Sequence, residues 1–243
     1  MPKIILVKDL VKDFSKRRAV NGISLEVDEG EIFGLIGPNG AGKTTTLRII
    51  ATIIKPTSGQ VMVCGKDVVR EASEVRRLIS YLPEEAGAYQ NLTGLEYLKF
   101  MASFYYGNED EVKSALEEGM RISGLGERLK EKSSAYSKGM KRRLQLARAL
   151  MIKPRLAILD EPTSGLDVTH AFQLRRLIKE YADKNRITVL LSSHNMLEVE
   201  NMCDRVAFIN EGKVVEVGPP DQLISKYGAE TLEEAFMKVV GFA

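Results

Sequence analysis

The chain has 243 residues, of which 44% are hydrophobic and 28% are charged. This balance excludes disordered and fibrous proteins and fits one folded domain with room for an inserted subdomain. Lys and Arg total 35 against 33 Asp and Glu, a formal net charge of +2. The chain therefore has no overall positive charge that would favour nucleic acid as a partner. Any anion that it binds must be bound by positive groups at a local site.

The sequence shows no signal for membrane insertion, secretion or disulfide formation. Its longest apolar runs, such as residues 32–36 and 156–159, are strand-sized, whereas a bilayer-spanning helix needs about 20 apolar residues. The first residues contain no apolar signal core with a cleavage site, so we expect the chain to stay in the cytosol. Cys64 and Cys203 lie far apart, which leaves a disulfide framework or a zinc site without ligands and predicts two buried, reduced thiols.

The N-terminal part of the chain alternates short apolar runs with turn residues. The runs lie at residues 4–7, 24–27, 32–36 and 61–64, and they predict mostly strands. From residue 92 to residue 150 the spacing becomes helical, which predicts a helical insert. Its expected apolar stripe consists of Val112, Ala115, Leu116, Met120 and Leu125.

Strand-like runs return after the insert. They lie at residues 156–159, 187–191, 206–209 and 214–217, with a helical stretch at 169–184. The order strand, helix, strand predicts parallel pairing, whereas the turn between the last two runs predicts an antiparallel hairpin. A short helical tail is expected after this hairpin, and no internal repeat is present, so the sequence predicts a mixed α/β core.

One glycine-rich segment carries the strongest functional signal. It consists of Gly37, Pro38, Asn39, Gly40, Ala41, Gly42, Lys43 and Thr44. The segment matches G-x-x-x-x-G-K-[ST] and lies between an apolar strand and a helix that begins near Thr45, as a phosphate-binding loop requires. In such a loop the backbone N–H groups surround phosphate oxygens, Lys43 reaches the β and γ phosphates, and the Thr44 hydroxyl ligates Mg²⁺. A turn that only joins strand and helix would not need all eight positions.

A second signal lies where the strand at residues 156–159 ends in Asp160 and Glu161. Parallel strands deliver charged groups to a ligand crevice at their carboxyl ends, so Asp160 is predicted to hold the magnesium shell. Successive strand side chains point in opposite directions, which leaves Glu161 to act as the base on an attacking water. Taken alone, the pair is equally consistent with a solvated strand end.

A third segment occupies the place of the signature L-S-G-G-Q, just before a helix at residues 141–150. It reads Tyr136, Ser137, Lys138, Gly139, Met140. With this segment, the chain resembles the ATP-binding subunit of an ABC transporter over nearly its whole length and in the family's order of motifs. Tyr136, Lys138 and Met140 depart from the signature, and Met140 in particular lacks the amide of the signature's Gln.

The resemblance implies an α/β fold with a P-loop NTPase core, a mostly parallel sheet and an N-terminal antiparallel β subdomain. The expected core covers residues 1–91 and 151–220, the helical subdomain residues 92–150, and the C-terminal helical tail residues 221–243, all within a single ABC-type ATPase domain. The implied cofactors are ATP and Mg²⁺.

The resemblance also implies residue roles around the γ phosphate. Ser137 and Gly139 are expected to close on the nucleotide of a second ATPase subunit in a head-to-tail dimer. Asp167 ends the segment that corresponds to the family's D-loop, and His194 ends a strand at the place of its switch histidine, where it can donate a hydrogen bond to phosphate. His170 is interpreted as structural.

Two further positions carry family roles less directly. Phe14 stands where the family has an aromatic that stacks on adenine, although its pattern alone is more typical of core. Glu84 stands where the family usually carries Gln, and neighbouring Glu85 complicates the assignment. A carboxylate can ligate Mg²⁺ but lacks the amide's hydrogen-bond donor, so coupling to the partner is expected to differ.

Cations crowd the start of the helix that follows the signature segment: Lys138, Lys141, Arg142 and Arg143. The helix dipole disfavours each by about 0.3 to 1 kcal/mol, so an anion such as a phosphate of the second subunit would relieve the conflict. For Arg142 and Arg143 we favour a solvated face.

The implied function is an ATP-hydrolysing subunit that drives a separate transmembrane transporter subunit from the inner face of the cell membrane. The acidic and aromatic segment at residues 231–238 and the glutamates at positions 84 and 85 favour export over import, as does the absence of a long C-terminal regulatory domain. The alternative is a soluble ABC-type ATPase that acts as a mechanical switch on ribosomes or DNA. A P-loop kinase or GTPase would leave Ser137, Asp167 and His194 without a purpose.

Overall fold

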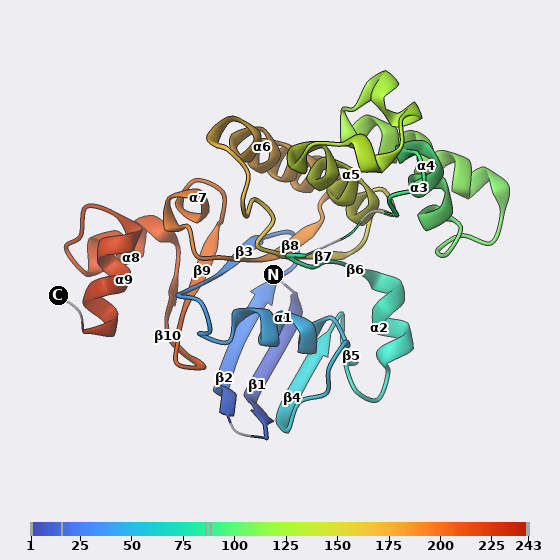
Figure 1. Cartoon of the computed structure of the whole chain (residues 1–243). Coiled ribbons are helices and arrows are strands. Elements are labelled where there is room, and N and C mark those ends of the chain that lie inside the picture. Colours follow the sequence, from blue (N-terminus) through green and yellow to red (C-terminus); the bar gives the residue numbers. More distant parts are fainter. Residues whose placement is uncertain (1, 16, 86, 88, 242–243) are drawn as a thin grey trace.

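The structure is a computed structural model that describes residues 2–15, 17–85, 87 and 89–241. Its centre is a six-stranded sheet in the order β10-β9-β3-β8-β7-β6, seen nearly edge-on in Figure 1. The strands are β3 (Ile32–Ile36), β6 (Ile79–Leu82), β7 (Leu156–Asp160), β8 (Thr188–Ser193), β9 (Arg205–Asn210) and β10 (Lys213–Gly218). All neighbours pair in parallel except β9 and β10, which form the expected antiparallel hairpin.

A second, antiparallel sheet lies below the first in Figure 1, in the order β2-β1-β4-β5. Its strands are β1 (Lys3–Phe14), β2 (Arg17–Asp28), β4 (Ser58–Val63) and β5 (Lys66–Asp67). Helix α1 (Lys43–Ile50) lies between the two sheets, and α2 (Ala72–Leu78) precedes the edge strand β6.

The remaining helices cover the opposite face and one end of the six-stranded sheet (Figure 1). The upper layer holds α3 (Gly94–Ala102), α4 (Glu109–Ser123), the 3₁₀ helices Gly126–Lys130 and Ser133–Ala135, α5 (Lys138–Leu150) and α6 (Val168–Asn185). At the end near β10 lie α7 (Met196–Glu200), α8 (Pro220–Lys226) and α9 (Leu232–Val240). Within the described residues, none of these helices is both long and apolar enough to cross a membrane.

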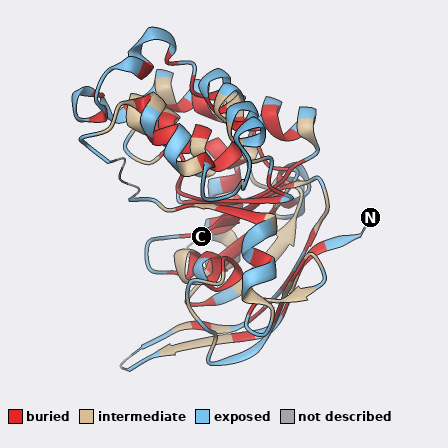
Figure 2. Cartoon of the chain, turned by 90° about the vertical axis from the view of Figure 1, so that its right-hand side faces the viewer, coloured by how far each residue is buried: buried red, intermediate tan, exposed pale blue. Residues whose placement is uncertain are grey.

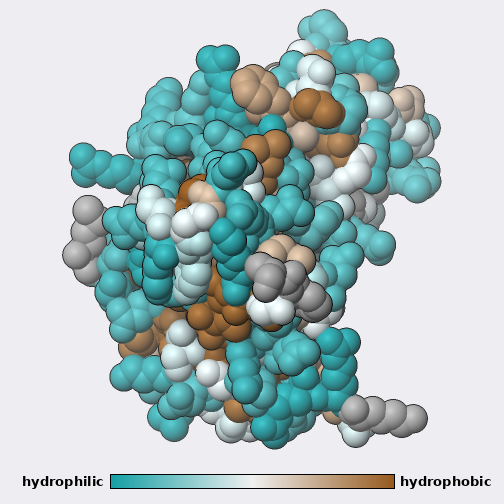
Figure 3. All heavy atoms as spheres, turned by 90° about the vertical axis from the view of Figure 1, so that its left-hand side faces the viewer, coloured by the Kyte–Doolittle hydropathy of each residue, from teal (hydrophilic) through white to brown (hydrophobic). Residues whose placement is uncertain are grey.

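Alternation along the buried strands explains why the sheet has an apolar cluster on each face. In β3, Ile32 and Ile36 pack toward the helices of the upper layer, whereas Phe33 and Leu35 pack toward α1 and the antiparallel sheet. Successive side chains of a strand point to opposite faces, so a strand buried on both sides is apolar throughout. Figure 2 shows these strands as the most continuously buried part of the chain, and Figure 3 shows a largely hydrophilic face with a hydrophobic patch in its lower middle.

The fold class expected from the sequence is confirmed, whereas the subdomain boundaries stay a prediction. The apolar stripe expected in the helical insert is wrong in detail, because α4 ends at Ser123 and Leu125 lies beyond the end of the helix. Gly119 faces Met151, where a Cβ would come within 3.0 Å of its sulfur, and this close approach leaves Met120 40% exposed. The two thiols are free, but only Cys203 is buried, since Cys64 is half-buried.

Candidate functional site

The glycine-rich segment forms a tight loop between β3 and α1. Gly42 is the N-cap of α1, with a left-handed φ of 108°. A Cβ on Gly42 would lie 2.5 Å from the Ala19 carbonyl oxygen. A Cβ on Gly37 would lie 2.0 Å from the Ile209 carbonyl oxygen. The loop is therefore pressed against the backbones of β2 and β9, and only glycine allows both contacts.

Lys43 begins α1 and curls back over the loop. Its Nζ donates hydrogen bonds to the carbonyls of Gly37 at 2.7 Å and Pro38 at 3.2 Å, and the residue is only 5% exposed. Burial lowers the pKa of the ammonium, and nearby Glu161 and Asp160 partly oppose that effect. The ammonium is thus held where phosphate oxygens would meet the loop.

Asp160, at the carboxyl end of β7, is fully buried and accepts hydrogen bonds from three hydroxyls. Thr44 donates to Oδ1 at 3.0 Å, Ser192 donates to the same oxygen at 2.6 Å, and Tyr81 donates to Oδ2 at 3.3 Å. Ser192 is the register partner of Asp160 on β8. The sequence analysis missed Ser192 and Tyr81, because no local motif marks a residue that acts through its place in the sheet.

Glu161 leaves the strand with a left-handed φ of 46°, a conformation rarely adopted by a non-glycine residue. Its N–H donates to the Ser192 hydroxyl at 3.0 Å. The carboxylate is nearly buried, with Oε2 at 2.9 Å from His194 Nδ1 and Oε1 at 3.7 Å from Lys43 Nζ. The two adjacent carboxylates therefore have different surroundings, and because Glu161 lies beyond the end of β7, its left-handed backbone rather than strand alternation sets the direction of its side chain.

The phosphate loop and Glu161 meet at a cavity of about 440 Å³, whereas Asp160 and His194 are not among the residues that line it. It is lined by Phe14, Arg17, Ala19, Asn39, Gly40, Gly42, Lys43, Thr44, Thr45, Glu84 and Glu161. Phe14 is 49% exposed at the end of β1, so the core position that its pattern alone suggests is wrong. Arg17, which the sequence analysis missed, faces Phe14 across the β1–β2 turn and donates to the Gly40 carbonyl at 2.5 Å. Its only sequence signal is a cation shortly after the aromatic residue.

Glu84 lies at the rim of this cavity on the exposed segment after β6. Its Oε1 accepts a hydrogen bond from the Ser164 hydroxyl at 3.3 Å. Ser164 belongs to the segment between Glu161 and α6, so the Glu84 carboxylate joins two of the predicted site segments.

The structure does not bring Ser137, Gly139 or Asp167 to the cavity. Ser137 and Asp167 are the N-caps of α5 and α6, and each accepts a hydrogen bond from a backbone N–H of its own helix. His170 lies between the two caps: its Nδ1 is 2.5 Å from Asp167 Oδ2, and a Cβ on Gly139 would lie 2.9 Å from its Cδ2. The signature segment and the start of α6 are thus packed together, away from the phosphate loop of the same chain.

The prediction of a solvated face is wrong for Arg142, which is 6% exposed. Its helix, α5, packs against the sheet, and the side chain points inward to the carbonyl groups at the ends of β6 and β7. Arg143 is half-buried and donates to Gln173 Oε1 at 2.5 Å. The sequence shows that charged residues lie at the start of this helix, but it does not show which face of the helix the tertiary fold buries.

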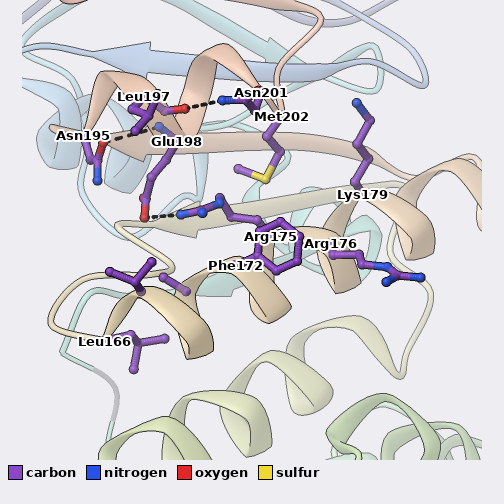
Figure 4. Close-up of a pocket in the computed structure, with 12 residues that line it drawn as sticks. Leu166, Phe172, Arg175, Arg176, Lys179, Asn195, Leu197, Glu198, Asn201 and Met202 are labelled. Carbon is purple, nitrogen blue, oxygen red and sulfur yellow. Dashed lines mark hydrogen bonds and ion pairs between the residues drawn. The ribbon is translucent and has the colours of Figure 1, made fainter.

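A separate cavity of about 580 Å³ lies between α6 and α7 (Figure 4). Across it, Arg175 of α6 donates to Glu198 of α7 at 2.6 Å. Glu198 also accepts a hydrogen bond from Thr163, in the segment after Glu161. The Glu198 carboxylate therefore connects α7 to α6 and to the segment after Glu161. Helix α7 begins shortly after His194.

A phosphate loop, a buried aspartate beside its threonine, and a glutamate at the same cavity define a P-loop nucleotide hydrolase. The chain belongs to the ABC transporter family, whose family model matches residues 20–164. Members of this family are ATP-binding ATPase subunits, so the chain is an ATPase.

Relatives and a solved structure agree with this assignment. The chain is 41% identical to the bacitracin transport ATP-binding protein BcrA of Bacillus licheniformis, over 92% of this chain and 72% of that protein. It is 36% identical to the linearmycin resistance ATP-binding protein LnrL of Bacillus subtilis, over 94% and 73%. The dimeric ATP-binding cassette MJ0796, in a post-hydrolysis state bound to ADP and Pi, is 25% identical with a TM-score of 0.80, over 88% of this chain and 98% of that one.

Proposed function

We propose that this chain is the ATP-hydrolysing subunit of a membrane exporter and works in a head-to-tail pair of ATPase subunits. The main observation behind the proposal is that the Lys43 ammonium lies 3.7 Å from the Glu161 carboxylate. Both residues line one cavity together with the phosphate loop. Relatives named for bacitracin transport and linearmycin resistance support a transport role. They favour it over the alternative, a mechanical switch on ribosomes or DNA.

In this proposal the cavity takes ATP. The backbone of residues 37–42, Lys43 and the start of α1 at Thr44 and Thr45 surround the phosphates, where positive charge and free N–H groups meet the anion. Phe14 stacks on the adenine, because its exposed ring is the aromatic surface at the cavity. Arg17 adds a second cation beside the loop.

Mg²⁺ fits the donors at the floor of the cavity. Thr44 Oγ1 and Asp160 Oδ1 are 3.0 Å apart, and hydroxyl and carboxylate oxygens are ligands that Mg²⁺ prefers, together with water and phosphate oxygens. Within the described part of the chain, no group of three or more His, Cys, Asp or Glu residues could hold a metal ion. Thr44 and Asp160 would hold the ion, with Glu84 as a further oxygen donor, and the ion would neutralise phosphate charge.

Glu161 acts as the general base of hydrolysis. Its carboxylate is held at the cavity by His194 and Lys43, so it can accept a proton from an attacking water. His194 holds that carboxylate and donates a hydrogen bond to the γ phosphate, while Lys43 stabilises negative charge on the phosphate oxygens.

The second subunit completes the site. Ser137, Gly139 and Asp167 lie away from the phosphate loop of their own chain, so they serve the nucleotide of the other subunit. The dimeric state of MJ0796 supports this pairing. Closure of the pair excludes water from the γ phosphate, and hydrolysis releases it.

The membrane partner docks near Glu84 and the helical insert. Tyr89 and Phe100 are exposed, their rings meet edge to face, and they border a surface cavity of about 810 Å³. An exposed apolar patch of this kind is stabilised when a partner covers it. The chain would then sit at the inner face of the cell membrane, and the partner would bind the transported substance.

The pairing is tested with purified Glu161→Gln protein. With Mg²⁺ and ATP, the variant is expected to hydrolyse about 10² to 10⁴ times more slowly than the parent and to accumulate as a dimer, measured by size-exclusion chromatography with light scattering. Lys43→Ala is the matched control and should stay monomeric. A variant that binds ATP but remains monomeric would overturn the head-to-tail pair.

The transport role is tested by what co-purifies with the tagged chain from gently solubilised native membranes in the presence of ATP. A multi-spanning membrane protein is the expected result. Recovery of ribosomes or DNA-repair proteins instead would keep the ATPase and favour the alternative.

A further inference from the structure

Arg142 is a buried residue that occupies the point where two site segments meet. Its Nε donates to the carbonyl of Pro162 at 2.7 Å, its Nη1 to Pro83 at 2.9 Å and Glu84 at 3.1 Å, and its Nη2 to Asp160 at 3.0 Å and Glu161 at 2.7 Å. A guanidinium has five N–H donors. All of them are used, and every acceptor is a backbone carbonyl.

The carboxylates of Asp160, Glu84 and Glu161 are near enough to favour the charged form of this cation, but carbonyl groups rather than a carboxylate bind it directly. Among the described residues, Arg142 takes part in no ion pair, although it is only 6% exposed. Burial lowers its pKa to about 10, so the guanidinium is still charged at neutral pH. A buried charge is costly unless it is fully hydrogen-bonded. A rigid planar guanidinium with five N–H donors is suited to bind five carbonyls at once, and an ammonium with three donors is not.

The backbone that Arg142 holds is strained. Its Nη2 donates to the carbonyls of Asp160 and Glu161, on both sides of the left-handed φ of 46° at Glu161. Such a conformation is unfavourable for a non-glycine residue and persists only where surrounding contacts fix it. The direction of the Glu161 carboxylate toward His194 and Lys43 depends on that conformation.

We propose that Arg142 is a positioning residue for ATP hydrolysis, which fixes the backbone of Glu161 and of the Glu84 segment to the first turns of α5. The inference rests on the proposed role of Glu161 as the base. Because α5 begins directly after Ser137, the base, the Glu84 segment and the signature segment are joined through one side chain and move together.

The test uses Arg142→Lys and Arg142→Gln, with Arg143→Gln as the matched control on the same helix. Arg142→Lys keeps the charge but cannot span the five carbonyls. Both Arg142 variants are expected to lower kcat by about 10- to 10²-fold, the cost of misplacing a reacting group, with ATP affinity within about threefold of the parent. Arg143→Gln should hydrolyse at the parent rate.

A double-mutant cycle separates positioning from a general loss of structure. If Arg142 acts through Glu161, adding Arg142→Lys to Glu161→Gln should slow single-turnover hydrolysis by less than about twofold, because the base is already gone. Two results would overturn the inference without touching the assignment of Glu161 as the base. One is a double variant whose rate loss equals the product of the two single-variant losses, and the other is an Arg142→Lys enzyme as fast as the parent. A Glu161→Gln enzyme at the parent rate would instead overturn the base, whatever Arg142 does. Should Arg142→Gln be unfolded in thermal melts, Arg142→Lys decides alone.

Discussion

The Nδ1 atom of His194 lies 2.9 Å from Oε2 of Glu161. The two residues follow β8 and β7, which are parallel neighbours in the sheet, so the sheet brings their side chains together at one edge. The carboxylate is nearly buried, whereas the imidazole is half exposed. His194 therefore links a buried carboxylate to the solvent-exposed surface.

Replacement of His194 by Ala should lower kcat by about 10², the usual cost of removing one hydrogen-bond donor from developing negative charge. ATP affinity should change little, because Lys43 and the loop backbone hold the phosphates. Steady-state hydrolysis and nucleotide binding measure the two effects. An Ala variant with the parent kcat would show that His194 only lines the site, and a Gln variant, which keeps a donor, should lose less.

Parts of the site could be predicted because they follow from local pattern. Lys43 and Thr44 lie in one short motif, and Asp160 and Glu161 end an apolar strand, so spacing alone places them at a sheet edge. Ser192 could not be found in this way, since its contact with Asp160 depends on the register of β7 and β8.

Arg142 shows why burial of a charged residue escapes sequence analysis. Its neighbours are cationic, and a run of cations is usually solvated, but the direction of each side chain depends on how α5 packs on the sheet. The same limit applies to Met120, whose exposure follows from the close approach of Gly119 to Met151. The hydrophobic periodicity identifies α4 as a helix, but it places Met120 on the buried face, where the structure has the neighbouring Gly119.

Lys43→Ala should weaken nucleotide binding itself. The ammonium is buried and aimed at the loop by the carbonyls of Gly37 and Pro38, so its loss removes the fixed cation nearest the expected phosphates. Titration with a fluorescent ATP analogue should show at least about a tenfold rise in Kd, the equivalent of about 1.4 kcal/mol. Lys213→Ala, an exposed lysine of β10, is the control and should bind like the parent. Unchanged affinity in Lys43→Ala would remove this residue from the phosphate site.

Gly42→Ala should be destabilising. A Cβ at this position would lie 2.5 Å from the Ala19 carbonyl oxygen, and the backbone has a φ of 108°. The expected loss in free energy of unfolding is about 1 to 3 kcal/mol, with loss of ATP binding as the loop shifts. Gly107→Ala is the matched control, because a Cβ there meets nothing within 4 Å. Equal urea midpoints for the two variants would contradict the close packing of the loop against β2.

Glu118 gives a stability prediction that depends on pH. Arg121 donates to both of its carboxylate oxygens, at 2.9 and 2.8 Å, and the Tyr181 hydroxyl, which donates to the Leu150 carbonyl, lies close enough to act on the same carboxylate. Together they lower the pKa of Glu118 from 4.5 to about 2. A carboxyl whose folded pKa is depressed stabilises the protein fully above its unfolded pKa, and this contribution is lost as pH falls through the folded value. The affected window is therefore between about pH 5 and pH 2.

The measurement compares the free energy of unfolding of the parent and Glu118→Gln across this window. At pH 7 the parent should be more stable by about 1 kcal/mol, a modest figure because Arg121 is half exposed and solvent screens the pair. The difference should shrink toward zero as pH approaches 2, since protonated Glu118 and Gln no longer differ in charge. Glu117→Gln is the control, because Glu117 is exposed on the same helix and should track the parent. A Glu118→Gln difference that stays constant with pH would mean that side-chain shape, rather than the charged contact with Arg121 on the same helix, accounts for the contribution of Glu118.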